Sequence, residues 1–304
     1  MIRLVIYIFL LFLNFSTRQP VLDSNRIDSD TQKPIVSFGI ISDIQYCNCE
    51  PDGTRFYSES LTKLRGAITD LNQYNLQFLI NLGDLIDRDI TSLDSLLPII
   101  GETNFPVYHV LGNHDFTENI KRGESINSLL NTGQGYYSFA LENFRFIVLN
   151  SSDISTYSPS SRSRKQASRL LESLTIDKGI NAYEWNGTLG SKQIEWLVNQ
   201  LDQAESIGEK VILFSHHPVW PESKYCMFEY DKILKLIANY NNIGAWFSGH
   251  NHNGAYGNLN LVHFVTFRGM VETEDLNSYS VIELYNNKIW IKGYGREKSQ
   301  ILAW

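Results

Sequence analysis

The sequence predicts a layered α/β (α+β) fold in which two mixed sheets pack face to face and helices lie outside. Short apolar runs bounded by turn residues alternate with amphipathic stretches in the first half, an order typical of a parallel sheet with helices. The end of the chain instead carries successive strand-like runs, which favour antiparallel pairing. The 304 residues, 43% of them hydrophobic, suffice for a substantial core, so we expect one domain at residues 35–304.

The first half of the chain gives the alternation of strands and helices. The expected elements are strand 35–41, helix 58–74, strand 78–82, helix 92–101 and strand 107–111. Residues 136–141 and 144–149 then flank Glu142-Asn143, which is typical of a hairpin turn. The pattern therefore changes from strand–helix alternation to a hairpin near the middle of the chain.

The second half adds a helix, for which Ser191 is the expected N-cap, and the remaining strands. The apolar face of this helix consists of Ile194, Leu197, Val198 and Leu201. Strand 211–214, helix 230–239 and strand 243–247 follow, and the chain closes with strands 261–267, 279–284 and 288–292. We expect these last strands to be antiparallel.

Residues 151–190 fit this order poorly, and we treat them as an insertion into the domain. They open with a Ser-rich stretch at 155–163, include a short basic helix candidate at 164–174, and contain Tyr183 and Trp185. Two interpretations remain open. The insertion is either a surface excursion or a lid over a functional site, a role that long loops in compact domains often have.

The N-terminal residues 1–18 resemble a signal peptide or an N-terminal anchor. Residues 4–13 are uninterruptedly apolar after Arg3, which suits a signal-peptide core but falls short of the roughly 20 residues that span a membrane. Residues 19–34 form a polar tail. We therefore expect a secreted or extracytoplasmic protein, periplasmic in a bacterium, with membrane attachment only if the segment is uncleaved.

Charge and cysteine content exclude several classes of function. The net charge of −7 and a pI near 5.5 argue against binding nucleic acid through a basic surface. The three cysteines, Cys47, Cys49 and Cys226, form no obvious disulfide framework and lack the partners of a structural zinc site. We interpret Cys47 and Cys49 as loop residues. As a separate expectation, the protein is a monomer.

Polar side chains follow five of the apolar runs at the point where each run ends. Together they supply four carboxylates, a Gln, an Asn and five His, which is a set of metal ligands at the strand ends where sheet-based folds place their sites. The pattern predicts a site for two metal ions. The segments are Asp43-Ile44-Gln45, Gly83-Asp84-Leu85-Ile86-Asp87, Gly112-Asn113-His114-Asp115, Ser215-His216-His217, Gly249-His250 and Asn251-His252.

In order and spacing, these segments resemble the calcineurin-like metallophosphoesterase superfamily, whose pattern is D-x-[H/Q]…GDxxD…GNH[D/E]…H…GHxH. The resemblance implies a βαβ sandwich and a metal-activated hydroxide that attacks phosphorus in line. It also implies two ligand sets that share Asp84 as a bridge. One metal would be held by Asp43, Gln45, Asp84 and His252, and the other by Asp84, Asn113, His216 and His250.

The resemblance assigns other roles to residues beside the ligands. His114 would stabilise the transition state or protonate the leaving oxygen, and Asp87 would orient its imidazole. The alternative for Asp87 is a turn cap. We expect His217 to support the site rather than bind metal, and we interpret His109 and His263, which lie within strands, as core or edge residues.

Gln45 departs from most relatives, which carry His at that place. An amide oxygen shifts the preference toward Mn²⁺ or Mg²⁺ and away from zinc, so we expect two divalent ions, Mn²⁺ first, with Mg²⁺ or Fe as alternatives. Together with Gly53-Thr54-Arg55-Phe56-Tyr57, this feature resembles the manganese-dependent ADP-ribose/CDP-alcohol diphosphatase group. The resemblance implies hydrolysis of the phosphoanhydride in small nucleotide substrates, namely nucleoside diphosphates joined to a sugar or an alcohol. Candidate substrate-binding residues are Arg55, Phe56, Tyr57, Tyr225 and Phe228, with Tyr183 or Trp185 from the insertion.

Alternative functions remain open at this point. The same motifs suit a phosphodiesterase or phosphomonoesterase acting on another small substrate. A purple acid phosphatase is disfavoured because it would carry Tyr where this chain has Asp87, and a protein Ser/Thr phosphatase because Asp115 and Asp89 replace its Glu and Gly. A non-catalytic binding scaffold is a distant alternative, since such a protein would be expected to lose ligands.

Overall fold

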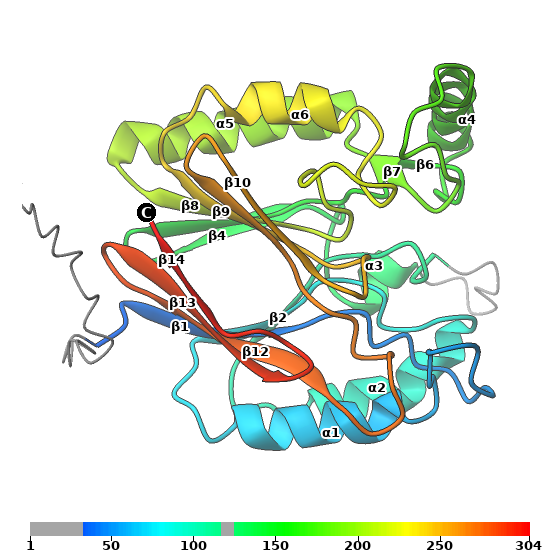
Figure 1. Ribbon diagram of the computed structural model, residues 1–304, viewed down its shortest axis with the longest axis vertical. Helices are drawn as coiled ribbons and strands as arrows, with labels where there is room; N and C mark the ends of the chain where they lie inside the picture. Colours follow the sequence, from blue (N-terminus) through cyan, green and yellow to red (C-terminus); the bar gives the residue numbers. More distant parts are fainter. Residues whose placement is uncertain (1–32, 117–124) are drawn as a thin grey trace, which may run out of the picture. The chain divides into compact units, whose positions relative to one another are not determined.

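The structure is a computed structural model that describes residues 33–116 and 125–304. In this part of the chain, two six-stranded sheets pack face to face (Figure 1). The first sheet has the order β14-β13-β12-β1-β2-β3, and the second has the order β10-β11-β9-β8-β5-β4. Both sheets mix parallel and antiparallel pairs, which confirms the predicted class of fold. The expected signal or anchor segment and most of the polar tail lie outside the described residues.

The strands of the first sheet are β1 (Val36–Ile41), β2 (Phe78–Asn81), β3 (Val107–His109), β12 (Ser278–Leu284), β13 (Lys288–Gly295) and β14 (Gln300–Ala303). Those of the second sheet are β4 (Tyr137–Leu141), β5 (Phe144–Val148), β8 (Lys210–Ser215), β9 (Ile243–Ser248), β10 (Ala255–Leu259) and β11 (Val262–Thr266). Strands β1, β2 and β3 are parallel, as are β5, β8, β9 and β11. Parallel strands share one carboxyl edge, so the loops after them converge.

Helices cover the outer face of each sheet (Figure 1). Helices α1 (Ser60–Leu71) and α2 (Leu93–Ile100) pack on the first sheet, and α5 (Ser191–Ile207) and α6 (Tyr230–Ile237) pack on the second. The short helices η1 (Ile90–Ser92) and α3 (Ile126–Leu129) lie in connections. Among the described residues, no helix is long and apolar enough to cross a membrane.

Apolar side chains that alternate along the inner faces of both sheets form the core between them. Its centre is aromatic: the rings of Phe38 and Phe78 stack with centroids 4.5 Å apart, and Phe146 meets both edge-on. Burial of these aromatic side chains is strongly stabilising. The core therefore holds both sheets rigidly behind the edge at which the parallel strands end.

The insertion consists of a helix and a small ladder rather than an irregular loop. Helix α4 (Ser161–Ile176) includes the predicted helix 164–174, and β6 (Ile154–Ser155) pairs with β7 (Gly187–Thr188). Ala167 is the buried residue of α4, which stands at the side of the second sheet in Figure 1. The ladder instead lies close to the site described below, so the two ends of the insertion are integrated with the domain.

Three local predictions were wrong. Ser191 was the expected N-cap of helix α5, but it is the first helical residue. The N-cap is Gly190, which has an extended backbone and no side chain that could cap the helix. Strand β11, which we expected to be antiparallel, is antiparallel only to β10 and runs parallel to its other neighbour, β9. Cys47 and Cys49 are joined by a disulfide, whereas Cys226 is free and buried. These two cysteines are separated by a single residue in one loop, and this spacing is not typical of a disulfide, so the bond was not predicted.

Candidate metal centre

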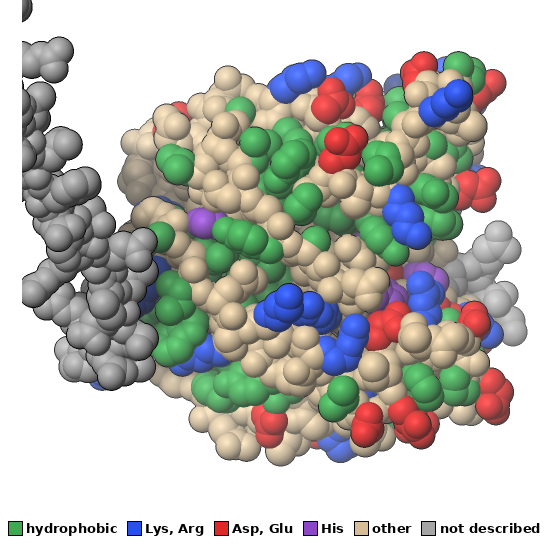
Figure 2. All heavy atoms as spheres, in the orientation of Figure 1, with side chains coloured by type: hydrophobic (Ala, Val, Ile, Leu, Met, Phe, Trp, Pro, Cys, Tyr) green, Lys and Arg blue, Asp and Glu red, His purple; other side chains and the backbone are tan. Residues whose placement is uncertain are grey.

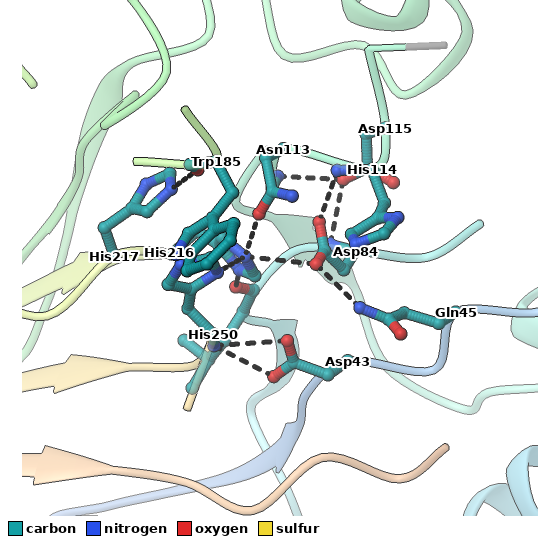
Figure 3. A network of polar contacts seen from close by, with 12 residues as sticks. Asp43, Gln45, Asp84, Asn113, His114, Asp115, Trp185, His216, His217 and His250 are labelled. Atoms are coloured by element: carbon teal, nitrogen blue, oxygen red, sulfur yellow. Dashed lines mark hydrogen bonds and ion pairs between the residues drawn. The ribbon is translucent and has the colours of Figure 1, made fainter. Parts of the chain in front are cut away.

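The predicted ligands converge at the carboxyl edge of the two sheets (Figure 3). The loop after β1 carries Asp43 and Gln45, and the loop after β2 carries Asp84. The remaining ligands follow β3, β8 and β9. We use the name candidate metal centre for the seven residues Asp43, Gln45, Asp84, Asn113, His216, His250 and His252.

Backbone conformation at the candidate metal centre is unusual. Asp43, Gln45, Asp84 and His250 have positive φ values of 50°, 44°, 55° and 68°. Non-glycine residues rarely adopt this left-handed conformation, and they cluster at functional sites when they do. Gly112 is required nearby, because a Cβ atom there would lie 2.1 Å from Oδ1 of Asp84. The loops therefore direct these side chains inward at a cost in backbone strain.

One half of the centre joins Asp43, Gln45, Asp84 and His252. The Nε2 atom of His252 lies 3.3 Å from Oδ1 of Asp43, and Nε2 of Gln45 lies 3.0 Å from Oδ2 of Asp84. Oε1 of Gln45 is buried without a hydrogen-bond partner among the described residues. A buried polar atom without a partner is costly. The amide of Gln45 lies between the Asp84 carboxylate and the His252 imidazole, a position that suits a ligand of a cation.

The other half joins Asp84, Asn113, His216 and His250. The Nε2 atom of His216 lies 3.2 Å from Oδ2 of Asp84 and 3.1 Å from Oδ1 of Asn113. Nδ1 of His250 lies 3.2 Å from the same His216 nitrogen. The Asp84 carboxylate thus contacts residues of both halves, as the predicted bridging role requires.

The second ring nitrogen of each of the three histidines is held by another part of the protein. Nδ1 of His216 lies 2.8 Å from the carbonyl oxygen of Leu82, and Nδ1 of His252 lies 2.8 Å from Oε1 of Glu272. Nε2 of His250 lies 3.2 Å from Oδ1 of Asn186. Each of these oxygens accepts the proton of one ring nitrogen, so the other nitrogen faces the centre and would bind a metal ion once its own proton is displaced, an arrangement typical of metal-binding histidines.

The electrostatics of the centre favour a cation. Burial raises the pKa of Asp84, but the neighbouring His216 lowers it, and the net pKa is well below its usual range. Burial lowers the pKa of His216 and His252, whereas the charges of Asp84 and Asp43 raise these pKa values to about 9. The carboxylates thus attract positive charge strongly, and the oxygen and nitrogen donors present fit two divalent ions.

Asp115 supports the centre through the backbone. Its carboxylate accepts hydrogen bonds from the N–H groups of Asp84, Leu85 and Gly112 at 3.0, 2.8 and 2.9 Å. It therefore fixes the loop on which Asp84 adopts its left-handed conformation. This supporting role of Asp115 could not be predicted from its place in the motif.

His114 and Asp87 form the pair that the sequence analysis predicts, with Nδ1 of His114 2.9 Å from Oδ1 of Asp87. Burial lowers the pKa of His114, but Asp84 and Asp87 raise it, with a net upward direction. His114 is partly exposed to the pocket and outside both ligand sets. Its catalytic role stays a prediction, since the geometry shows only that the imidazole is oriented.

His217 has both ring nitrogens engaged away from the ligands. Nδ1 lies 2.7 Å from Oγ of Ser151, and Nε2 lies 2.9 Å from the carbonyl oxygen of Trp185. This arrangement fits the predicted supporting role, in which His217 ties the insertion to the loop after β8. His109 and His263 are buried in strands, as expected.

A pocket of about 420 Å³ opens over the candidate metal centre. Figure 2 shows histidine side chains at the right of the face, next to basic and acidic side chains. Among the predicted substrate-binding residues, Arg55 and Tyr225 line this site pocket, together with Trp185 from the insertion. The complete lining is Gln45, Arg55, Asp84, Asn113, His114, Trp185, Lys224, Tyr225, His250 and His252.

Two predicted substrate contacts, Phe228 and Tyr57, are corrected by the structure, whereas the contact predicted for the half-buried Phe56 stays a prediction. Phe228 is fully buried, and Tyr57 is buried against Cys47 and Val271. Phe56 does not line the site pocket, and its backbone N–H donates to the carbonyl of Val271. The rings of Tyr57 and Phe228 pack inside the protein, because burial of apolar rings is more favourable than their exposure to water.

Several residues of the site escaped the sequence analysis. Lys224 lines the site pocket, Glu272 contacts His252, and Asn186 contacts His250. None belongs to a motif, and each lies in a segment remote from its partner. Lys224 precedes Tyr225, so a basic residue beside a candidate aromatic was the one available signal.

A centre of this composition, at the strand ends of a two-sheet sandwich, defines a dinuclear metal phosphohydrolase. Residues 36–254 match the model of the calcineurin-like phosphoesterase family, and the chain belongs to this family. The fold is also that of a solved structure, a dimetal phosphatase from Danio rerio, with a TM-score of 0.80 and 24% identity over 89% of this chain and 99% of that one.

Curated relatives extend over almost the whole chain. A protein from Mus musculus is 29% identical over 90% of this chain and 95% of its own length. One from Arabidopsis thaliana is 29% identical over 89% and 98%, respectively. Both carry the name manganese-dependent ADP-ribose/CDP-alcohol diphosphatase. This chain is accordingly an enzyme of metal-dependent phosphoester hydrolysis, similar to that diphosphatase.

Proposed function

We propose that the enzyme uses manganese to hydrolyse the phosphoanhydride of nucleoside diphosphates joined to a sugar or an alcohol, such as ADP-ribose or CDP-alcohols. The observation that carries the proposal is the position of Gln45, an amide within a cluster of carboxylates and histidines. The names of relatives that are 26–29% identical support it. The products would be a nucleoside monophosphate and a second phosphate ester.

The ligands of the centre account for the expected metal. Gln45 and Asn113 each supply an amide oxygen, so both halves would combine hard oxygen donors with imidazole, a set that suits Mn²⁺. When bound, two such ions supply Lewis-acid charge and hydroxide near neutral pH. Asp84, which touches both halves, would hold the ions together.

The other pocket residues act on the substrate itself. His114, oriented by Asp87, is placed to stabilise charge on the leaving oxygen or to protonate it. Arg55 and Lys224 line the same pocket and would bind the phosphate that is not attacked, Arg55 through a planar pair of donors. Two cationic side chains suit a diphosphate better than a single phosphate ester.

A substrate panel tests the proposal. The Mn²⁺-loaded enzyme is assayed on ADP-ribose, CDP-choline, cyclic AMP and p-nitrophenyl phosphate, and kcat/KM is expected to be highest for the first two. Arg55→Ala should lower kcat/KM for ADP-ribose more than for p-nitrophenyl phosphate. A preference for cyclic AMP or p-nitrophenyl phosphate would instead identify a phosphodiesterase or a phosphomonoesterase.

We also propose that the enzyme works outside the cytoplasm. The apolar segment 4–13 after Arg3 supports this location, and the disulfide of Cys47 and Cys49 is compatible with an oxidising compartment. N-terminal sequencing of protein from its native host is expected to start beyond residue 14. An intact Met1 on cytosolic protein would contradict the proposal.

A further inference from the structure

We infer that Trp185 is the platform on which the nucleobase of the substrate stacks, and that His217 and Asn186 hold this platform beside the candidate metal centre. The inference rests on the proposed function and adds the recognition of the base to it. The insertion would then contribute to the active site as a fixed wall rather than as a surface excursion.

Trp185 presents an aromatic surface inside the site pocket. Its side chain is 39% exposed, and its ring lies on that of Tyr183, which is 38% exposed, with centroids 4.3 Å apart and planes 14° from parallel. Trp185 lines this pocket together with Asn113 and His250, and Figure 3 shows its side chain in the same view as the candidate ligands. Single exposed aromatic residues are common, but a stacked pair of which one member lines a pocket beside cationic side chains is a candidate surface for binding a planar ligand. A planar base that stacks on the indole would cover it.

Hydrogen bonds from the domain hold the backbone of Trp185 in place. Its carbonyl oxygen lies 2.9 Å from Nε2 of His217 and accepts a further hydrogen bond of 3.3 Å from the hydroxyl of Tyr157. His217 is fully buried next to the candidate ligand His216. These contacts hold the backbone of Trp185 relative to the centre, and the stack on Tyr183 restricts the indole itself, which lowers the entropic cost of binding a base there.

Asn186 connects the two walls of the site pocket. Its buried Oδ1 lies 3.2 Å from Nε2 of His250, while Nδ2 donates to the carbonyl oxygens of Lys224 at 2.8 Å and Asn181 at 3.0 Å. One side chain thus links a candidate ligand, the segment before Trp185 and the segment that carries Lys224. The base platform and the phosphate-binding side would move together.

The charge of the pocket selects the occupant of the platform. Aromatic faces bind quaternary ammonium groups as well as bases, so the choline of a CDP-alcohol is the rival ligand. Arg55 and Lys224 line the same pocket, and two cations disfavour a third. A neutral base attached to a diphosphate fits both features, because the ring stacks while the phosphates meet the cations.

The test compares Trp185→Ala and Trp185→Phe with Trp290→Ala, which removes a partly exposed indole on β13 outside the site pocket. In the Mn²⁺-loaded enzyme, Trp185→Ala should raise KM for ADP-ribose about tenfold, equivalent to about 1.4 kcal/mol, with a smaller change in kcat. Trp185→Phe should recover part of the affinity, whereas Trp290→Ala should leave KM and kcat for ADP-ribose at the wild-type values.

Calorimetric titration with AMP provides a readout that does not depend on turnover. Weaker AMP binding in Trp185→Ala than in Trp290→Ala supports the inference, whereas equal binding in the two variants overturns it. A loss confined to CDP-choline would assign the platform to the cationic alcohol and overturn it as well. If wild-type enzyme binds AMP through Trp185 but leaves ADP-ribose intact, the proposed function fails while the platform stands.

Discussion

The Nδ1 atom of His114 lies 2.9 Å from Oδ1 of Asp87, and Oδ2 of the same carboxylate accepts a 2.9 Å hydrogen bond from Nε of Arg88. Asp87 is buried, so its charge acts on His114 with little screening by water. His114, oriented by Asp87, would act on the substrate, whereas the seven residues of the candidate metal centre would bind the metal ions. This division can be tested residue by residue.

Replacing His114 with Ala removes the imidazole and leaves the candidate ligands in place. We expect kcat to fall about 10²–10⁴-fold, the range for loss of a general acid, while bound manganese stays at the wild-type level. Steady-state kinetics and elemental analysis of the same samples measure both. A His114→Ala protein that had lost its metal would show that His114 is a ligand.

Asp84→Asn should have the opposite signature. Loss of this shared charge is expected to abolish manganese binding at both halves, and with it the rise in Tm that we expect Mn²⁺ to give the wild-type protein. Asp87→Asn, an equivalent change in the same loop, serves as the control and should retain the metal. If Asp84→Asn bound manganese as well as the control, the shared role of Asp84 would be wrong.

Gln45→His replaces the amide of the candidate metal centre with an imidazole. Exchange of an amide oxygen for imidazole should raise Zn²⁺-supported activity severalfold relative to Mn²⁺-supported activity. Metal-free protein is reconstituted with each ion in turn, and wild-type enzyme is expected to prefer Mn²⁺. A zinc preference of the wild-type enzyme would refute the role given to Gln45.

Glu272 supports His252 without being part of any motif. Its hydrogen bond to His252 lowers the pKa of Glu272 to about 2, so the group is an anion that polarises the imidazole. Glu272→Gln keeps the shape and removes the charge, and we expect manganese affinity to fall about 10–100-fold. Competition with a fluorescent chelator measures this affinity, and an unchanged value would make Glu272 purely structural.

His109 gives stability an acid-side pH dependence that is independent of the centre. Burial lowers its pKa from 6.5 to about 4, so the fold holds the neutral imidazole. This contribution is fully present above pH 6.5 and is lost as pH falls through 4. Linkage predicts that it costs about 2 kcal/mol between pH 7 and pH 5.

Denaturant unfolding of chelated protein at the two pH values measures this effect. His109→Gln is expected to lose about 2 kcal/mol less stability than wild type over the same interval. Parallel losses in the two proteins would show that His109 titrates normally in the folded state.

The candidate ligands could be predicted because each follows directly on a strand. Once Phe78–Asn81 is recognised as β2, the position of Asp84 at the sheet edge is determined by local sequence. The chemistry of the donors needed no tertiary information. The left-handed backbone conformation of Asp84 could not be predicted from the sequence, because it depends on hydrogen bonds that the N–H groups of this loop donate to Asp115.

The pocket walls were harder to predict because they depend on packing between remote segments. Tyr57 and Tyr225 are both aromatic residues in loops that follow strands, yet Tyr57 is buried and Tyr225 lines the site pocket. Sequence composition does not distinguish these outcomes. Asn186 likewise looks like an ordinary loop residue until the fold brings it to His250.

Strand β10 was missed because its sequence, Ala255–Leu259, contains Gly and Asn, which are infrequent in strands. It forms because the tight turn at Asn260 and Leu261, with φ values of 52° and 68°, returns the chain onto β11. Leu261 is an unusual residue for this conformation, so the turn gave no recognisable signal.

The most direct test of the central claim is a titration of metal-free protein with Mn²⁺ during hydrolysis of ADP-ribose. AMP and ribose 5-phosphate are separated by chromatography while bound manganese is counted. The account predicts no turnover in chelator and a rate that saturates at two bound ions per chain. Turnover that persists in chelator, or two tightly bound ions without release of AMP, would contradict it.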